Sequence, residues 1–309
     1  DFLTGWMPFA LVYVFAIGLL FFIGYQTFKW VKNKNGWRSK LLVSLHYSLA
    51  FAGGVVFFFL ALWGYNYDRV PLEKAVGISP DTLSTNELRL ELDAATADMV
   101  RLRALLPGIS DSAIADDLMP VDLENEVREE LKKCLAQFGY PSPGSVRGRI
   151  LAPKGLLLRL STAGIYIPFT GEGHVDGGLH HLQLPFVLAH EMSHGYGFGD
   201  EGTCNFLAYL ALTQSENAYL RYVGHLYYWR YVASDYRFYE PEAYEIFRES
   251  LPLGVRNDLL AIRNEMEKYP DILPAVRDAL YGSYLRAQGI EEGLKNYDRV
   301  ILLVRAWRR

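Results

Sequence analysis

Two long stretches without any charged residue constrain this chain more than any other feature of its sequence. Residues 2–28 and residues 41–67 are uncharged and mostly apolar, and each exceeds the roughly 20 residues that cross the hydrocarbon core of a bilayer. Buried core helices of soluble proteins rarely run so long without a charge, so we interpret both stretches as membrane-spanning helices. Aromatic residues typical of membrane interfaces lie near their ends: Trp6, Trp30, Trp63, Tyr65 and Tyr67.

The segment 29–40 between the two stretches carries five basic residues and no acidic one. Short loops with this charge face the cytoplasm under the positive-inside rule, so the outer ends of both helices face away from the cytoplasm. Residues 1–67 are therefore predicted to be a two-helix anchor in the lipid bilayer. The whole chain has a net charge of −4, so the part beyond this basic anchor is acidic. This charge argues against nucleic acid as a partner, because nucleic acid needs a basic face.

Beyond the anchor, the pattern predicts a mainly helical α+β protein with a small β-sheet. Ser84 and Glu87 form a capping-box pattern at the start of one helix, and two or three short strands are expected in 149–168, ending near GIYIPFTGEGHVDG. We divide this part into a helical linker, 68–140, and a catalytic domain, 141–309. Apolar spacing and proline breaks predict helices in these ranges: 84–106, 121–138, 205–233, 241–250, 254–269 and 272–289.

The sequence HEMSH places His190, Glu191 and His194 in the order H-E-x-x-H. On a helix, residues four apart share one face, so the two imidazoles can bind one Zn²⁺ ion. Glu191 points about 100° around the helix, where it can act as a general base toward a water on the metal. The alternative is a structural pair of histidines, which would leave two desolvated imidazoles beside a carboxylate.

A catalytic zinc ion takes three protein ligands, and two candidates for the third follow the motif directly. Asp200 completes H-E-x-x-H-x-x-G-x-x-D, which resembles a metzincin variant, but metzincins need a methionine turn and the only later methionine is Met266. Glu201 and Asn205 resemble the E-x-x-x-D/N signature of gluzincins, in which the second residue steadies a metal ligand. We favour Glu201 over Asp200, and a helix cap is the structural alternative for either.

Hydrolysis also needs a donor that stabilises the developing oxyanion. His225 and Tyr228, on the aromatic stretch after the motif, are the candidates, with simple packing as the alternative. In zincins an edge strand before the active-site helix pairs with an extended peptide, and GIYIPFTGEGHV has the position to accept a substrate as an added β-strand. We interpret His174 in this segment as an exposed loop residue.

The chain resembles the bacterial membrane family called domain of unknown function 3810, which is grouped with zincin-like peptidases. The resemblance covers nearly the full length. Family members read E-x-E-A-N-F-L-A-Y after the histidine motif; Glu201 and Asn205 match, while Thr203 and Cys204 replace the second Glu and the Ala. The matching segments are GWMPF, LWGYNYDRVPLE, STAGIYIPFTGEGHV, LPFVLAHEMSHGYGF, CNFLAYLAL and NYDRV.

This resemblance implies a zincin fold and a peptidase without an established substrate. Together with the residues above, it predicts a zinc metallopeptidase with one Zn²⁺ ion, anchored in a bacterial cytoplasmic membrane. The catalytic domain is expected on the periplasmic or extracytoplasmic side, with a peptide or protein as substrate. Two alternatives remain: a catalytically silent zinc-binding scaffold, and a zinc hydrolase that cleaves a non-peptide amide of the cell wall.

Overall fold

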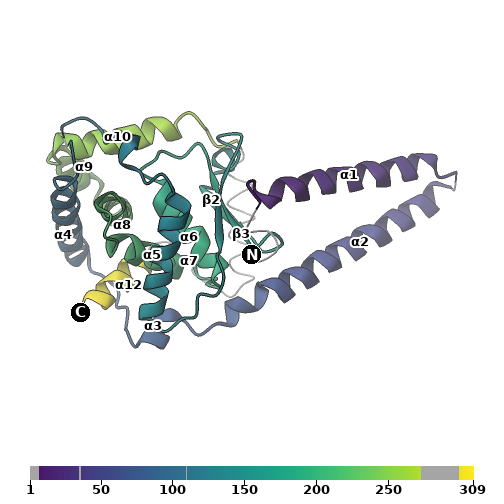
Figure 1. Cartoon of the computed structure of the whole chain (residues 1–309), viewed down its shortest axis with the longest axis horizontal. Coiled ribbons are helices and arrows are strands. Elements are labelled where there is room, and N and C mark those ends of the chain that lie inside the picture. The colour runs from purple at the N-terminus through teal and green to yellow at the C-terminus, as the bar shows by residue number, and fades with distance from the viewer. Residues whose placement is uncertain (1–6, 35, 109, 273–298) are drawn as a thin grey trace.

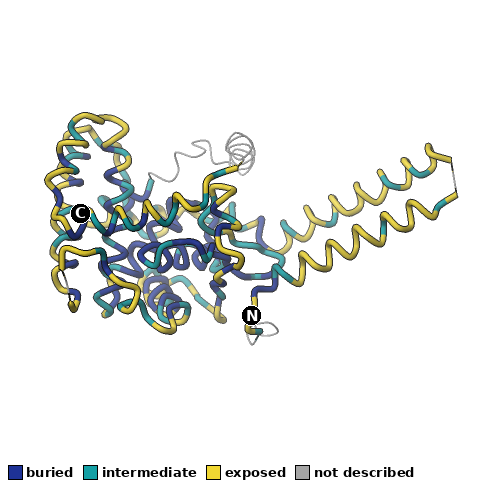
Figure 2. The backbone as a smooth tube through the Cα atoms, turned by 90° about the horizontal axis from the view of Figure 1, so that it is seen from above, coloured by how far each residue is buried: buried dark blue, intermediate teal, exposed yellow. Residues whose placement is uncertain are grey.

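A helical body and a long helical hairpin make up the protein in a computed structural model that describes residues 7–34, 36–108, 110–272 and 299–309 (Figure 1). The hairpin consists of α1 (Leu11–Lys32) and α2 (Trp37–Leu62), which project together from one side of the body. Almost none of either helix is buried, as the exposed tube in Figure 2 shows. Their length and composition make both candidate membrane-spanning helices, so the predicted pair of long apolar N-terminal helices is confirmed.

The small sheet lies at the side of the body from which the hairpin projects (Figure 1). Its strands are β1 (Arg147–Leu151), β2 (Gly164–Ile167) and β3 (Glu172–Asp176), in the spatial order β1-β3-β2. β1 runs parallel to β3 and β2 runs antiparallel to it. Within the described part of the chain β2 is therefore an edge strand, and both β2 and β3 lie in the segment GIYIPFTGEGHVDG, near which the predicted strands end.

Three helices follow the sheet: α6 (Leu184–Gly195), α7 (Glu201–Thr213) and α8 (Ala218–Tyr239). The single helical stretch predicted over 205–233 is thus two helices. The chain turns between them, and the Asn217 side chain accepts a hydrogen bond from the backbone N–H of Tyr219 at 2.9 Å. An asparagine cap of this kind satisfies the first free N–H groups of a helix, so α8 starts anew at this point.

The remaining helices surround this centre. The predicted capping box of Ser84 and Glu87 is present at the start of α4. The helix predicted over 272–289 lies outside the described residues, except for residue 272 itself. The C-terminal segment forms a helix whose apolar face is buried. These helices are α3 (Leu72–Val76), α4 (Thr85–Arg103), α5 (Leu123–Gln137), α9 (Pro241–Glu249), α10 (Leu253–Met266) and α12 (Arg299–Arg308).

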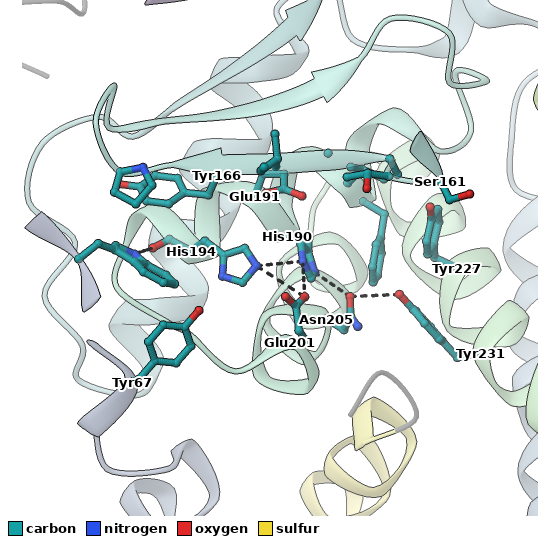
Figure 3. Close-up of a pocket in the computed structure, with 18 of the residues that line it drawn as sticks. Tyr67, Ser161, Tyr166, His190, Glu191, His194, Glu201, Asn205, Tyr227 and Tyr231 are labelled. Carbon is teal, nitrogen blue, oxygen red and sulfur yellow. Dashed lines mark hydrogen bonds and ion pairs between the residues drawn. The ribbon is translucent and has the colours of Figure 1, made fainter. Parts of the chain in front are cut away.

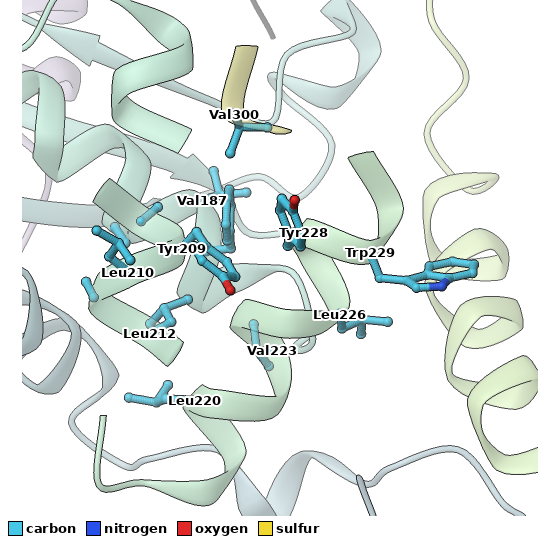
Figure 4. Close-up of a cluster of buried hydrophobic side chains, with 14 of the residues drawn as sticks. Val187, Tyr209, Leu210, Leu212, Leu220, Val223, Leu226, Tyr228, Trp229 and Val300 are labelled. Carbon is cyan, nitrogen blue, oxygen red and sulfur yellow. The ribbon is translucent and has the colours of Figure 1, made fainter. Parts of the chain in front are cut away.

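One hydrophobic core joins these elements, from Leu72 near the anchor to Val304 near the C-terminus. Large aromatic side chains are buried in it (Figure 4): the rings of Tyr209 on α7 and Tyr228 on α8 contact each other, whereas Trp229 projects from the other side of α8 and donates to Thr96 of α4. Both predicted parts, 68–140 and 141–309, contribute side chains to this core. The boundary between them stays a prediction, and the mainly helical fold class with a small sheet is confirmed.

Candidate metal centre

The H-E-x-x-H sequence lies on α6, a helix whose local sequence suits a buried position. Pro185 occupies the first turn, where its missing N–H costs nothing and its fixed φ angle favours the helix. The apolar side chains that follow bury the helix against the sheet and against α7. The helix ends at Gly195, the chain turns, and α7 begins at Glu201. This turn, which contains Gly197 and Gly199, brings the start of α7 back to the two histidines.

Three side chains converge between the two helices (Figure 3). The Nε2 atoms of His190 and His194 lie 3.2 Å apart. One carboxylate oxygen of Glu201 lies 3.1 Å from Nε2 of His190 and 3.6 Å from Nε2 of His194. Four ligand atoms arranged as a tetrahedron around one zinc ion at about 2.0–2.1 Å lie about 3.3 Å from one another. The three side chains therefore already have the mutual spacing of a zinc-binding set.

The hydrogen bonds of the Nδ1 atoms of His190 and His194 leave both Nε2 atoms available to bind a cation. Nδ1 of His194 lies 2.8 Å from the carbonyl oxygen of Phe198, which can only accept a hydrogen bond, so this nitrogen carries a proton. Nδ1 of His190 lies 2.7 Å from Oδ1 of Asn205, and the same argument applies to it. In the neutral imidazoles both Nε2 atoms then present lone pairs to each other and to a carboxylate, and a bound cation relieves that repulsion.

The close contact of these side chains also shifts the pKa values of Glu201 and His194. Burial alone would raise the pKa of the Glu201 carboxyl, but the adjacent His194 and His190 hold that pKa well below its usual range. Burial opposes a charged His194, yet the neighbouring Cys204 and Glu201 outweigh it and raise the pKa of this imidazole. Glu201 is therefore an anion that demands a positive partner, which a metal ion or a shared proton can supply.

The two alternatives for the third ligand occupy different places. Only Glu201 lies with the two histidines, and all three side chains could hold one metal ion. Asp200 instead caps α7, where its Oδ1 accepts hydrogen bonds from the backbone N–H and the hydroxyl of Thr203, both at 2.7 Å. Its other oxygen pairs with Arg299 at 2.9 Å. Asp200 thus has the helix-cap position that was the structural alternative for either residue.

Glu191 lies beside this cluster beneath the sheet (Figure 3). Two glycines make room for it: a Cβ added at Gly164 would lie 2.6 Å from a Glu191 carboxyl oxygen, and one at Gly173 would lie 2.7 Å from the Glu191 Cβ. Burial is the largest influence on Glu191 and raises its pKa above the ordinary value. A carboxyl group with a raised pKa is a stronger base once ionised, which suits proton transfer near neutral pH.

A cavity of about 740 Å³ opens over the cluster. His190, Glu191, His194, Glu201 and Asn205 all line it, so the cavity gives solvent access to the potential ligands. The segment 161–166, which includes most of the edge strand β2, forms one wall. The end of the hairpin forms another, through Phe59, Trp63 and Tyr67. A volume of this size is in the ordinary range of ligand sites.

His225 and Tyr228, predicted to stabilise an oxyanion, do not line this cavity. The hydroxyl of Tyr228 donates to Glu91 at 2.7 Å within the core, and the ring of His225 lies beside Tyr209. They face away because that side of α8 packs against α4 and α7. We therefore drop the catalytic role for both residues and keep the packing alternative.

Two other tyrosines of α8, Tyr227 and Tyr231, line the cavity instead. The hydroxyl of Tyr231 donates to Oδ1 of Asn205 at 3.1 Å, while the ring of Tyr227 stacks on Phe186 at 4.1 Å between centroids. The spacing of four residues between the two tyrosines was a sequence signal that could have found them. The helical periodicity of the sequence could not show which face of α8 meets His190, His194 and Glu201.

His174, interpreted from sequence as an exposed loop residue, is fully buried in β3. Its Nε2 lies 3.4 Å from the Glu172 carboxylate, which also pairs with Arg149 and accepts the backbone N–H of Leu11. The interpretation was wrong because the segment is a central strand, covered by α6 on one side. His174 does not line the cavity, and it belongs to a buried charged group that fastens α1 to the sheet.

Comparison with known proteins gives a family match and no named relative. A family model described as "Protein of unknown function (DUF3810)" matches residues 1–304. The chain belongs to this family. No matching curated protein and no matching solved structure was found. The zincin-like character implied by the sequence resemblance therefore depends on the geometry of the site alone.

Proposed function

We propose that this DUF3810 chain is a membrane-anchored, zinc-dependent peptidase. The observation that carries the proposal is the convergence of His190, His194 and Glu201 with Glu191 beside them in one open cavity. Two histidines and a glutamate are the ligand set of a large group of zinc peptidases, in which the glutamate between the histidines is the base. A site that served only stability would need neither the base nor the opening.

A zinc ion in this site would polarise the scissile carbonyl group and make an attacking water more acidic. Glu191 accepts the proton of that water and returns it to the leaving nitrogen. The hydroxyl of Tyr227 has no hydrogen-bond partner among the described residues and faces the same cavity. It is the donor that we assign to the developing oxyanion, in place of His225 and Tyr228.

The substrate is proposed to bind as an extended strand along β2. This strand pairs with β3 on one side only within the described residues, and its residues Gly164, Ile165 and Tyr166 line the cavity. Backbone groups along such an edge can bind a peptide without reading its side chains. The location that we propose is a bacterial cytoplasmic membrane, with the helical body on its extracytoplasmic side, because the basic residues 29–40 lie at the far tip of the hairpin.

Metal analysis tests the first step of this proposal. Purified full-length protein should contain about one zinc ion per chain, and Glu201→Gln should lose most of it because the variant removes a charged ligand. Asp200→Asn is the matched control, since it changes the adjacent carboxylate while an amide oxygen can still cap α7. Metal that persists in Glu201→Gln and disappears in Asp200→Asn would overturn the ligand assignment.

Activity is tested separately with Glu191→Gln, which should keep the zinc ion and lose peptide cleavage by at least about a hundredfold. A mixed peptide library and isolated cell-wall material are digested in parallel, and the products are identified by mass spectrometry. Release of cell-wall amides alone would favour the non-peptide hydrolase. A zinc-loaded protein inert toward both would favour the scaffold.

A further inference from the structure

The membrane anchor itself forms part of the cavity. Phe59 belongs to α2 and lies one helical turn before its last residue, Leu62, yet it lines the cavity together with Trp63 and Tyr67. The helix that we assign to the bilayer therefore ends against the metal centre. No spacer separates the two.

This contact is a fixed one. The indole N–H of Trp63 donates to the carbonyl oxygen of His194 at 2.9 Å, and the Trp63 ring lies 6.0 Å from the His194 ring. The guanidinium of Arg69 donates to the carbonyl groups of Tyr196 and Gly197 at 3.2 and 3.1 Å. The chain that leaves the membrane is thus bonded to the turn between the two ligand-bearing helices. These contacts hold the candidate metal ligands at a fixed position relative to the end of α2.

The other helix fixes the opposite end of the sheet. The backbone N–H of Leu11 donates to Glu172 at 2.8 Å, and the Tyr13 hydroxyl bonds both the carbonyl oxygen and the N–H of Ala152 at 2.8 and 2.7 Å. These contacts hold β1 and β3 near the start of α1, while Trp63 holds the β2 side at 5.8 Å from Tyr166. The sheet therefore lies between the two points where the hairpin meets the body (Figure 1).

The length of α2 sets the height of the site. From Leu41, the first residue after the basic segment, to Leu62 the helix rises about 33 Å, close to the roughly 30 Å of a hydrocarbon core. Leu62 then lies at the outer edge of that core and Trp63 in the headgroup layer, which is about 5–8 Å deep. Because the ring centroids of Trp63 and His194 are 6.0 Å apart, an α2 that crosses the bilayer upright would hold His190, His194 and Glu201 at headgroup depth.

We infer that the site cleaves membrane proteins within about five residues of the point where their chain leaves the bilayer. This inference depends on the proposed peptidase function and names its substrate class. A segment that continues from a membrane-spanning helix is already at headgroup depth, and its tether gives it a high effective concentration at the site. The apolar side chains of Phe59, Ile165 and Phe186 in the cavity suit a chain that arrives from that layer.

The test uses full-length protein in phosphatidylcholine vesicles with three matched substrates. Each carries the same randomised eight-residue segment: directly after a single membrane-spanning helix, after that helix and a 20-residue Gly-Ser spacer, or as a free peptide. Products are identified by mass spectrometry, with Glu191→Gln as the background. We expect cleavage of the first substrate to be at least tenfold faster than that of the other two, and the advantage to shrink in detergent micelles.

Each other outcome has a definite meaning. Equal, Glu191-dependent cleavage of all three substrates would overturn the inference and leave the peptidase function intact. Faster cleavage of the free peptide would do the same. Failure to cleave any of them with zinc bound would overturn the peptidase function and this inference with it. Glu191-dependent release of a headgroup or a fatty acid from the vesicles alone would replace the protein substrate with a lipid.

Discussion

At the scale of single residues, Asn205 orients one of the three side chains that could hold a metal ion. Its Oδ1 accepts hydrogen bonds from Nδ1 of His190 and from the hydroxyl of Tyr231, at 2.7 and 3.1 Å. The first bond fixes both the tautomer and the orientation of the imidazole, so that Nε2 points at the potential metal position. The cysteine next to it, Cys204, lies 3.4 Å from Nδ1 of His194 and closes the space behind the second histidine.

Replacing Asn205 by leucine should weaken zinc binding about 10- to 100-fold, because a group that orients a ligand is lost while the volume is kept. A competition titration with a chromophoric chelator measures this affinity. Tyr231→Phe is the matched control, since it removes the other hydrogen bond to Asn205, and we expect its zinc affinity to stay within threefold of the wild type. Wild-type affinity in Asn205→Leu would show that the bond to His190 has no part in metal binding.

His225 predicts a pH dependence of stability rather than of catalysis. Burial lowers the pKa of this imidazole to about 4, whereas an unfolded chain has a histidine pKa of about 6.5. Between these values the unfolded state binds more protons, so stability falls as the pH falls from about 6.5 to 4. His225→Phe should reduce this slope of the unfolding free energy in detergent solution. An unchanged slope would mean that His225 is solvated in the folded protein.

At the scale of elements, the turn between α6 and α7 joins the metal centre to the anchor. Gly197 has a φ angle of +89°, and a Cβ at this position would lie 3.1 Å from Oδ1 of Asn66 and 3.2 Å from the Arg69 guanidinium. A Cβ at Gly199 would lie 2.8 Å from the Tyr67 ring. The glycines that follow the histidine motif thus permit the close approach of η1 (Gly64–Asp68), in addition to turning the chain.

Gly197→Ala should therefore cost more unfolding free energy than Gly77→Ala. Both glycines have a positive φ angle, which costs an alanine about 1–2 kcal/mol, but nothing lies within 4 Å of a Cβ at Gly77. Chemical denaturation in detergent compares the two variants. Only Gly197→Ala should also weaken zinc binding, because the adjacent Phe198 carbonyl holds His194. An equal loss of unfolding free energy in both variants would show that η1 can move to accommodate a methyl group at position 197 without strain.

At the scale of the whole molecule, the two ends of the hairpin differ in charge, and the hairpin and the body differ in burial. The basic residues of 29–40 lie around the tip of the hairpin (Figure 1), and the other end of the hairpin lines the cavity over the candidate metal ligands through Phe59 and Trp63. The hairpin is exposed along its length, while the body encloses one core (Figure 2). This contrast is the one expected if lipid surrounds the hairpin and water surrounds the body.

Cysteine labelling tests the proposed orientation. The two native cysteines, Cys134 and Cys204, are buried, so a new surface cysteine gives the signal. With a membrane-impermeant maleimide on intact cells, Val121→Cys in the body should react, and Lys34→Cys at the hairpin tip should react only after permeabilisation. The reverse pattern would place the body in the cytoplasm and refute the extracytoplasmic location.

The sequence by itself determined the features that depend on short-range spacing. His190, His194, Glu201 and Asn205 each lie four residues from a partner on the same helix, and helical geometry alone brings such pairs onto one face. The capping box of α4 and the two long apolar helices are likewise read from a few neighbouring residues or from an unbroken run. The turn between α6 and α7 could also be anticipated, because glycine is the residue that a sharp turn selects.

Only the tertiary structure decided what depends on contacts between distant elements. The packing of α8 against α4 selected Tyr227 and Tyr231 for the cavity and turned His225 and Tyr228 away. Pairing on both sides made β3 a central strand and buried His174. The contact of Trp63 with His194 joins residues 131 positions apart. Local periodicity defines the faces of a helix but not the partner that each face meets, so the contact between the end of α2 and the candidate metal ligands could not be predicted from the sequence.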